Sequence, residues 1–173
     1  MPRARGERAA ADAPRLRIAI GDPQAGARGF TVSHENAAAA RLVALSTAHG
    51  RDRSVVAYSD PGVVLLGLFA PDPGTAREWA TAVLGDLAES GEQNATLRAT
   101  LAAYFASGEN VMRTADALGL HRNTVRARVS RCLDGRAEGY DPLELGLALR
   151  LFDAFPADLM NGGRSSAPRR VLH

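Results

Sequence analysis

The stretch from Gly108 to Leu133 constrains the fold of this chain most strongly, because it predicts two short helices joined by a tight turn. In the first helix, Val111, Ala115 and Leu118 recur at helical spacing. Gly119 then interrupts the pattern, and its lack of a Cβ allows the left-handed conformation that a sharp turn needs. A helix, a tight turn and a second helix form a shape with which proteins read DNA.

The second helix of this stretch has an apolar and a polar face. Val125, Val129 and Cys132 recur at i, i+4 and i+7 and should face inward. The remaining side chains should face solvent or lie at the flanks, and these are Arg122, Asn123, Arg126, Ala127, Ser130, Arg128 and Arg131. At the ends of the two helices, Asn110 should cap the first and Leu120 should plug the turn.

The polar face has the chemistry of base and phosphate recognition. Arg can donate twice to guanine and Asn can pair with adenine when a helix N-terminus enters a major groove. We therefore expect Arg122, Asn123 and Arg126 to contact base edges. Contacts to phosphates are expected from His121, Thr124, Arg128 and Arg131. His121 has the alternatives of capping the helix or lying exposed, and an Arg-rich helix can also be no more than a solvated face.

These motifs resemble the helix-turn-helix domain of PucR/CdaR-type bacterial transcription regulators. That family shows Leu-x-x-Thr-Leu-x-x-Tyr, Gly-x-Asn, Ala-x-x-Leu and His-Arg-Asn-Thr-Val-Arg-x-Arg in this order. The matching segments here are Leu97–Tyr104, Gly108–Asn110, Ala115–Leu118 and His121–Arg128, followed by Ala148–Leu151 at the end of the last helix. The resemblance implies a DNA-binding regulator of transcription, which we expect to read the major groove with the helix starting near Arg122.

Three departures from the family pattern bear on single contacts. The family usually has an aromatic residue where Ala127 stands, a Glu near Leu133, and an Arg just before the final helix, where this chain runs directly through Tyr140–Glu144. The two charged residues are absent together, so we hypothesise that they form a pair in other members. This explanation requires Leu133 to be at least partly buried.

The first half of the chain predicts a small α/β unit. Strands are expected at Arg15–Ile20 and Ser54–Tyr58, and a helix capped by Ser33 should join them, which favours a parallel pair. Two strands are too few for a stable sheet alone. Residues 15–91 resemble the later part of the GGDEF-like domain that precedes the DNA-binding module in the family, although no GGDEF sequence and no acidic pair for a metal-bound nucleotide is present.

The helices expected in this half have recognisable inward faces. The helix after Ser33 should bury the apolar residues Ala37, Ala40, Leu42 and Leu45. The apolar run Val63–Ala70 should form a buried helix or strand against the sheet. In the helix Thr75–Ala88, the inward stripe should consist of Trp79, Val83 and Leu87, with ligand stacking as the alternative role of Trp79.

Composition limits the other classes of function. The chain has 173 residues, 46% of them hydrophobic, which suffices for one ordinary core or two small ones. All 21 basic residues are Arg, and those from Arg122 onward concentrate positive charge in the second half. Cys132 lacks a second cysteine, and His34, His49 and His173 have no ligand spacing, so neither a disulfide nor a metal site is expected. Without a signal peptide or an apolar run of membrane length, the expected location is the cytoplasm.

We therefore expect an α+β, mainly helical fold with four parts: a disordered lead-in (1–14), a partial GGDEF-like domain (15–91), a helix-turn-helix domain (92–155) and a flexible basic tail (156–173). The last helix, capped by Asp141, is apolar around most of its circumference, so this helix or the incomplete sheet should form a homodimer contact. The main alternative is a truncated regulator that dimerises without productive DNA binding. No catalytic triad, carboxylate pair, phosphate loop or cofactor motif indicates an enzyme.

Overall fold

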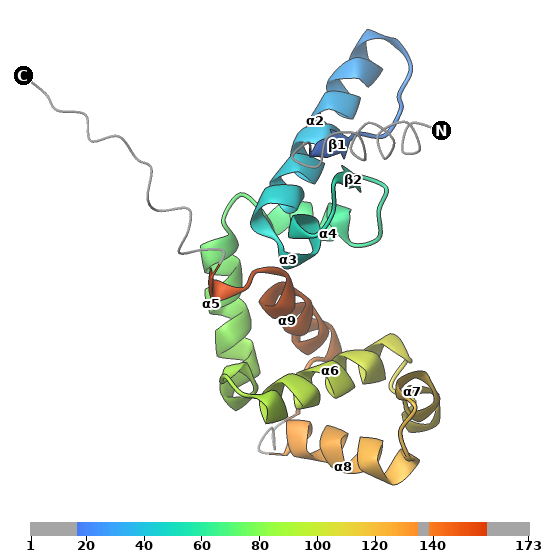
Figure 1. Cartoon of the computed structure of the whole chain (residues 1–173), viewed down its shortest axis with the longest axis vertical. Helices are drawn as coiled ribbons and strands as arrows, with labels where there is room; N and C mark the ends of the chain where they lie inside the picture. Colours follow the sequence, from blue (N-terminus) through green and yellow to red (C-terminus); the bar gives the residue numbers. More distant parts are fainter. Residues whose placement is uncertain (1–16, 135–138, 159–173) are drawn as a thin grey trace, which may run out of the picture. The chain divides into compact units, whose positions relative to one another are not determined.

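The computed structural model describes residues 17–134 and 139–158, and the fold is mainly helical with one small two-stranded sheet, as expected (Figure 1). The predicted disordered lead-in lies outside the described residues, as does the predicted tail beyond Asp158. The chain divides into two compact units. One contains Glu78–Phe152, and the other contains the residues before and after it.

The small sheet lies in the unit that precedes Glu78 and pairs strands β1 (Ile18–Ile20) and β2 (Val55–Ala57). The strands are parallel, with Ile18 beside Val55 and Ile20 beside Ala57, which confirms the expected strand, helix, strand order. Their connection consists of helix α2 (Gly26–Ser46) and the short helix α3 (Ala48–Arg51). All three residues of β2 are buried, whereas those of β1 are half-buried.

Helix α2 begins at Gly26, so the prediction that Ser33 caps it was wrong. Two nearby glycines allow the preceding loop to lie against the helix. A Cβ on Gly21 would lie 1.9 Å from the carbonyl oxygen of Ser33, and a Cβ on Gly29 would lie 2.7 Å from the carbonyl carbon of Gln24. Glycine is required here for close packing of backbone, and this contact is invisible to a local reading of turn residues.

The inward face of α2 also differs from the expected one. Ala40, Val43 and Ala44 are buried, while Leu42 and Leu45 are exposed. The run Val63–Ala70 contains helix α4 (Val63–Phe69), which packs along α2 with Gly67 close to Ala39 and Val43. Val63 and Ala70 are buried, whereas Val64 and Leu68 are exposed (49% and 73%). The expectation of a buried helix or strand therefore holds for one side of this run only.

Helix α5 (Pro73–Leu84) continues into a 3₁₀ turn, η1 (Gly85–Ala88). Its buried stripe consists of Ala76, Ala80 and Leu84, whereas Trp79 and Val83 of the expected stripe are only half-buried. Leu87 is buried as predicted, because Gly85 adopts a positive φ of 56° and the tighter 3₁₀ turn brings Leu87 back to the inward side.

The other unit contains helices α6 (Glu92–Ala106), α7 (Val111–Leu118), α8 (Arg122–Leu133) and most of α9 (Pro142–Ala154). In Figure 1, α6 and α8 lie side by side, and α7 connects them at one end. Within the described residues, no helix is long and apolar enough to cross a membrane.

Helix α9 starts as its sequence predicts and packs against α6. The Asp141 carboxylate accepts a hydrogen bond from the amide of Leu143 at 2.8 Å, which confirms the cap. The guanidinium of Arg98 lies 4.8 Å from the ring centre of Phe152. Most of the apolar positions of α9 are buried within the chain, and Leu143 is the exception at 79% exposure. The helix therefore offers much less apolar surface to a second copy than its sequence suggests.

Candidate nucleic-acid interface

Local hydrogen bonds define both ends of α7, as the sequence predicts. The side-chain oxygen of Asn110 accepts from the amide of Arg113 at 3.1 Å, which confirms Asn110 as the cap. At the other end, Gly119 is left-handed, with φ 63° and ψ 32°. The amide of Leu120 then donates to the carbonyl of Ala115 at 2.9 Å, so the chain reverses within two residues.

A small apolar cluster holds α7 and α8 together. Its buried members are Ala115, Val125 and Val129, and Leu120 and Leu133 pack against them while remaining partly exposed. The cluster confirms the predicted inward face of α8 and places Leu120 as the plug of the turn. Leu133 is half-buried, so our explanation for the missing charged pair keeps its packing rationale.

The inward face of α7 contains one residue that the apolar pattern missed. Thr114 is fully buried, and its hydroxyl donates to the carbonyl of Asn110 at 2.8 Å. This bond satisfies the hydroxyl inside the helix and allows a polar residue at an inward position. Leu118, which the pattern placed on that face, is 37% exposed.

His121 caps the N-terminus of α8. Its Nδ1 accepts from the amide of Asn123 at 3.3 Å, and its carbonyl accepts from the amides of Thr124 and Val125. Because Nδ1 is an acceptor, the neutral ring carries its proton on Nε2. The imidazole is exposed, so this Nε2–H can donate to an outside anion while Nδ1 remains the cap.

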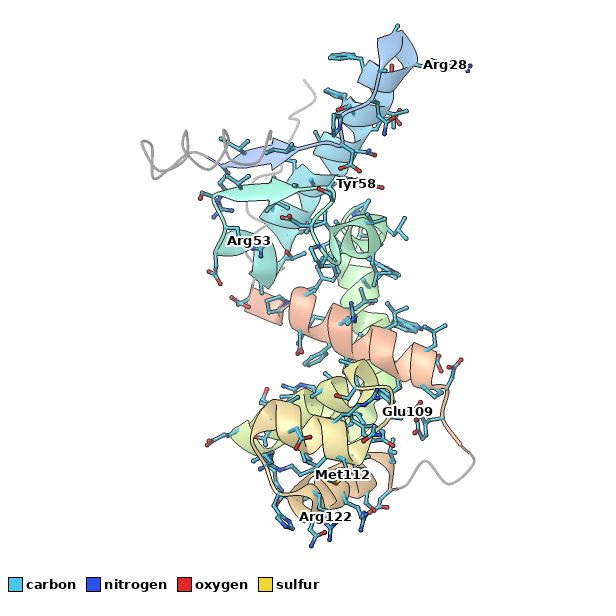
Figure 2. The ribbon with its side chains drawn as sticks, turned by 90° about the vertical axis from the view of Figure 1, so that its right-hand side faces the viewer. Arg28, Arg53, Tyr58, Glu109, Met112 and Arg122 are labelled. Atoms are coloured by element: carbon cyan, nitrogen blue, oxygen red, sulfur yellow. The ribbon has the colours of Figure 1, made fainter. Side chains whose placement is uncertain are left out.

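The predicted base-reading residues lie together on the exposed side of the first two turns of α8. Arg122, Asn123 and Arg126 are all exposed, and Figure 2 shows Arg122 pointing away from the protein. Arg122 and Arg126 are four residues apart and therefore share one face of the helix.

The predicted phosphate contacts divide into two locations. His121 lies at the cap, whereas Thr124, Arg128 and Arg131 line a groove of about 820 Å³ between α6 and α8. Asn123 and Ala127 complete the α8 wall, and α6 contributes Gln93 and Thr96 to the other wall. The sequence did not predict the role of α6, because no local pattern shows which helix lies beside α8.

Side chains of α6 contact both arginines of the groove. The guanidinium of Arg128 donates to the hydroxyl oxygen of Thr100 at 3.4 Å. The Gln93 amide, oriented with its oxygen toward α8, accepts from Arg131 at 2.9 Å. These contacts cross between helices and hold two cations at the border of the exposed face of α8.

The loop before α7 contains a backbone conformation that is uncommon for a residue other than glycine. Glu109 has a φ of 59°. Its carboxylate accepts a hydrogen bond from the Tyr140 hydroxyl at 3.3 Å, which links this loop to the segment before α9. Burial raises the pKa of Tyr140, and the adjacent Glu109 carboxylate raises it further.

Comparisons with known proteins agree with this geometry. Residues 97–134 match the PucR C-terminal helix-turn-helix domain. The chain is also 37% identical over 103 residues to a protein of Thermomonospora curvata described as an uncharacterized protein in the pkwA 5′ region. This alignment covers 60% of the present chain and 54% of the relative, so the chain spans about half the length of that protein. No solved structure gives a significant match. The domain match does not extend before Leu97, so the GGDEF-like nature of residues 15–91 stays a prediction.

Proposed function

We propose that the chain is a sequence-specific DNA-binding transcription regulator in which α8 enters the major groove. The observation that carries this proposal is the coincidence of two findings. Residues 97–134 match a helix-turn-helix domain, and the exposed N-terminal turns of its second helix present Arg122, Asn123 and Arg126. The apolar cluster and the Gly119 turn fix α8 relative to α7, so these side chains project from a rigid support.

Base reading is assigned to Arg122, Asn123 and Arg126, because their side chains are free to extend beyond the helix. An Arg forks to O6 and N7 of guanine, and Asn pairs with N6 and N7 of adenine. Phosphate contacts are assigned to His121, Thr124, Arg128 and Arg131. The exposed His121 lies at the N-terminus of α8, where the helix dipole also favours an anion.

The test is the selection of bound sequences from a random duplex pool, followed by affinity measurements on the selected site. Arg122→Ala should cost about 1–3 kcal/mol at one base position and relax specificity there. Arg131→Ala should instead weaken selected and random duplexes alike. Equal losses of specific and random binding in both variants would show that this division of roles is wrong.

Salt dependence distinguishes this function from the main alternative, a module that assembles with other proteins and does not bind DNA productively. A DNA-binding domain that neutralises several phosphates loses affinity steeply as salt rises. Weak, salt-insensitive DNA binding together with co-purification of a related regulator would favour the alternative. Exposed apolar residues on α2 and α4, including Phe30 (73%) and Leu68 (73%), are the observation that keeps this alternative open.

A homodimer is part of the proposal. The exposed apolar side chains of α2 and α4 are its most suitable contact surface, since α9 buries most of its own leucines. Two copies would place two α8 helices on successive half-sites, so selection should enrich a two-fold repeat. A monomer mass that does not depend on protein concentration would contradict the dimer and leave the DNA-binding proposal untouched.

A further inference from the structure

We propose that the groove between α6 and α8 is a preorganised seat for the phosphates of one DNA strand, in which Thr100 and Gln93 position Arg128 and Arg131. This inference rests on the proposed DNA-binding function and deepens it. It assigns a role in DNA affinity to two residues of α6, a helix outside the α7–α8 hairpin from which no DNA contact was expected.

The first support is the fixed geometry of Thr100. Its side chain is 1% exposed, and its hydroxyl donates to the carbonyl of Thr96 at 2.8 Å. The hydroxyl proton is therefore committed, and the oxygen lone pairs are left to accept from Arg128. The buried hydroxyl oxygen of Thr100 holds the Arg128 guanidinium in one place, and Arg128 is half-buried beside the groove.

Restraint of this kind favours binding because a free Arg side chain loses rotamer freedom when it contacts a phosphate. An Arg side chain carries roughly 2 kcal/mol of such entropy. Buried Thr100 restricts Arg128 before DNA arrives, and the exposed Gln93 side chain contacts both terminal nitrogens of the exposed Arg131. A guanidinium has five N–H donors, so one bond from Arg128 and two from Arg131 leave the other donors available for phosphate oxygens.

The composition and shape of the groove suit a nucleic-acid backbone. Besides the two arginines, its walls contain Thr96 and Thr124, whose hydroxyls can donate to phosphate oxygens. The groove is open to solvent, which fits a strand that passes across it better than an enclosed small molecule. Thr124 and Arg131 are seven residues apart, about 10 Å along the helix, enough to meet more than one phosphate.

One lining residue opposes anion binding. Glu92, in the first turn of α6, places a carboxylate on the groove. Because a phosphate approaches this carboxylate when DNA binds, removal of its charge should strengthen binding to every sequence. Glu92→Gln should therefore raise the affinity for DNA, a result that is not expected if the groove residues only stabilise the fold.

The experiment measures DNA affinity of the full chain against salt concentration for single and double variants. Arg128→Ala and Arg131→Ala should each weaken random duplex by about tenfold or more and lower the slope of log affinity against log salt by about 0.9. Thr100→Val, which keeps the shape and removes the hydroxyl, should weaken binding by roughly threefold to tenfold. In the Arg128→Ala background, Thr100→Val should have no further effect, since its partner is already absent.

Gln93→Ala provides an independent arm, because Gln93 is exposed and its truncation does not threaten folding. Gln93→Ala alone should weaken DNA binding, and it should have no further effect in a chain that already carries Arg131→Ala. Arg150→Ala is the matched control: it removes the same charge from an exposed position of α9, outside the groove, and should leave the salt slope unchanged. Thermal unfolding of Thr100→Val identifies any loss that arises from misfolding.

The outcomes separate this inference from the proposed function. If the native chain binds no duplex, the proposed function fails and the inference with it. If native DNA binding is steep in salt and sensitive to Arg122→Ala, but Arg128→Ala and Arg131→Ala keep the native slope, the inference and the phosphate contacts of these two arginines are overturned, while major-groove reading by α8 stands. Additive effects of Thr100→Val and Arg128→Ala overturn the positioning role. Saturable binding of inorganic phosphate that does not compete with duplex DNA would show that the groove binds a free anion, and it would overturn the proposal that the groove binds DNA phosphates.

Discussion

Replacement of Gly119 by Ala tests whether the turn between α7 and α8 depends on backbone conformation alone. At φ 63° and ψ 32°, an L-residue costs about 1–2 kcal/mol relative to its ordinary conformations. A Cβ at this position would meet no atom within 4 Å, so the substitution adds no steric clash. Ala also restricts the unfolded chain, which returns about 0.4–1 kcal/mol. The net loss of unfolding free energy should therefore be about 1 kcal/mol.

Thermal unfolding followed by far-UV circular dichroism is a suitable assay. For a chain of this size, a loss of about 1 kcal/mol corresponds to a fall in Tm of roughly 2–4 °C. Gly119→Asn should be less harmful than Gly119→Ala, because Asn tolerates the left-handed region better than other side chains.

Gly146→Ala is the matched control. Gly146 lies inside α9, and its added Cβ would be in ordinary contact with Phe105 at 3.7 Å. The same substitution should therefore stabilise the protein by about 0.5–1 kcal/mol. If both Gly→Ala variants shift Tm in the same direction, or if Gly119→Asn is as harmful as Gly119→Ala, the turn does not depend on the left-handed conformation as argued.

Three further predictions concern the same unit. Asn110→Ala should lower the unfolding free energy by about 1 kcal/mol because the α7 cap is lost, whereas Asn110→Asp should keep most of the stability that the cap provides. Chemical denaturation measures the unfolding free energy of both variants. Val125→Ala should cost about 2 kcal/mol, because Val125 is fully buried; a Tm equal to that of the native chain would contradict the observed cluster. Since folding raises the pKa of Tyr140, stability should decline as pH rises above about 10, where the unfolded chain loses this proton first. Tyr140→Phe should remove that part of the decline, and an unchanged pH profile would show that burial and the Glu109 carboxylate do not raise the pKa of Tyr140 on folding.

Features that depend on one or two helical turns were predictable from the sequence. The caps at Asn110 and Asp141, the left-handed Gly119 and the inward Val125 and Val129 all agree with the structure. The caps join groups within four residues of one another, and the two valines lie one helical turn apart, so the local pattern contains the information that predicts them. The exposure of Arg122 and Asn123 follows from the same periodicity, while their contacts with DNA stay predictions.

Features that depend on distant partners were not predictable in this way. The start of α2 was misplaced at Ser33, because the close approach of Gly21 to the Ser33 carbonyl joins two segments and is not visible in a local pattern. The buried face of α2 was also misjudged. Leu42 and Leu45 are apolar, but they face away from the elements that cover this helix. Hydrophobicity shows which side chains favour burial, whereas the neighbouring elements decide which of them are covered.

The sequence by itself determined the helix, turn and helix from Gly108 to Leu133 and the polar side chains that α8 presents, because helix periodicity and capping act over a few residues. Only the tertiary structure decided that α6 lies beside α8 and brings Thr100, 28 residues away in sequence, into contact with Arg128. The physical reason is that such a contact depends on how two helices pack, and packing is set by the side chains of both helices together. The groove and the positions of its arginines therefore follow from the tertiary structure, while the exposed residues of α8 follow from its local sequence.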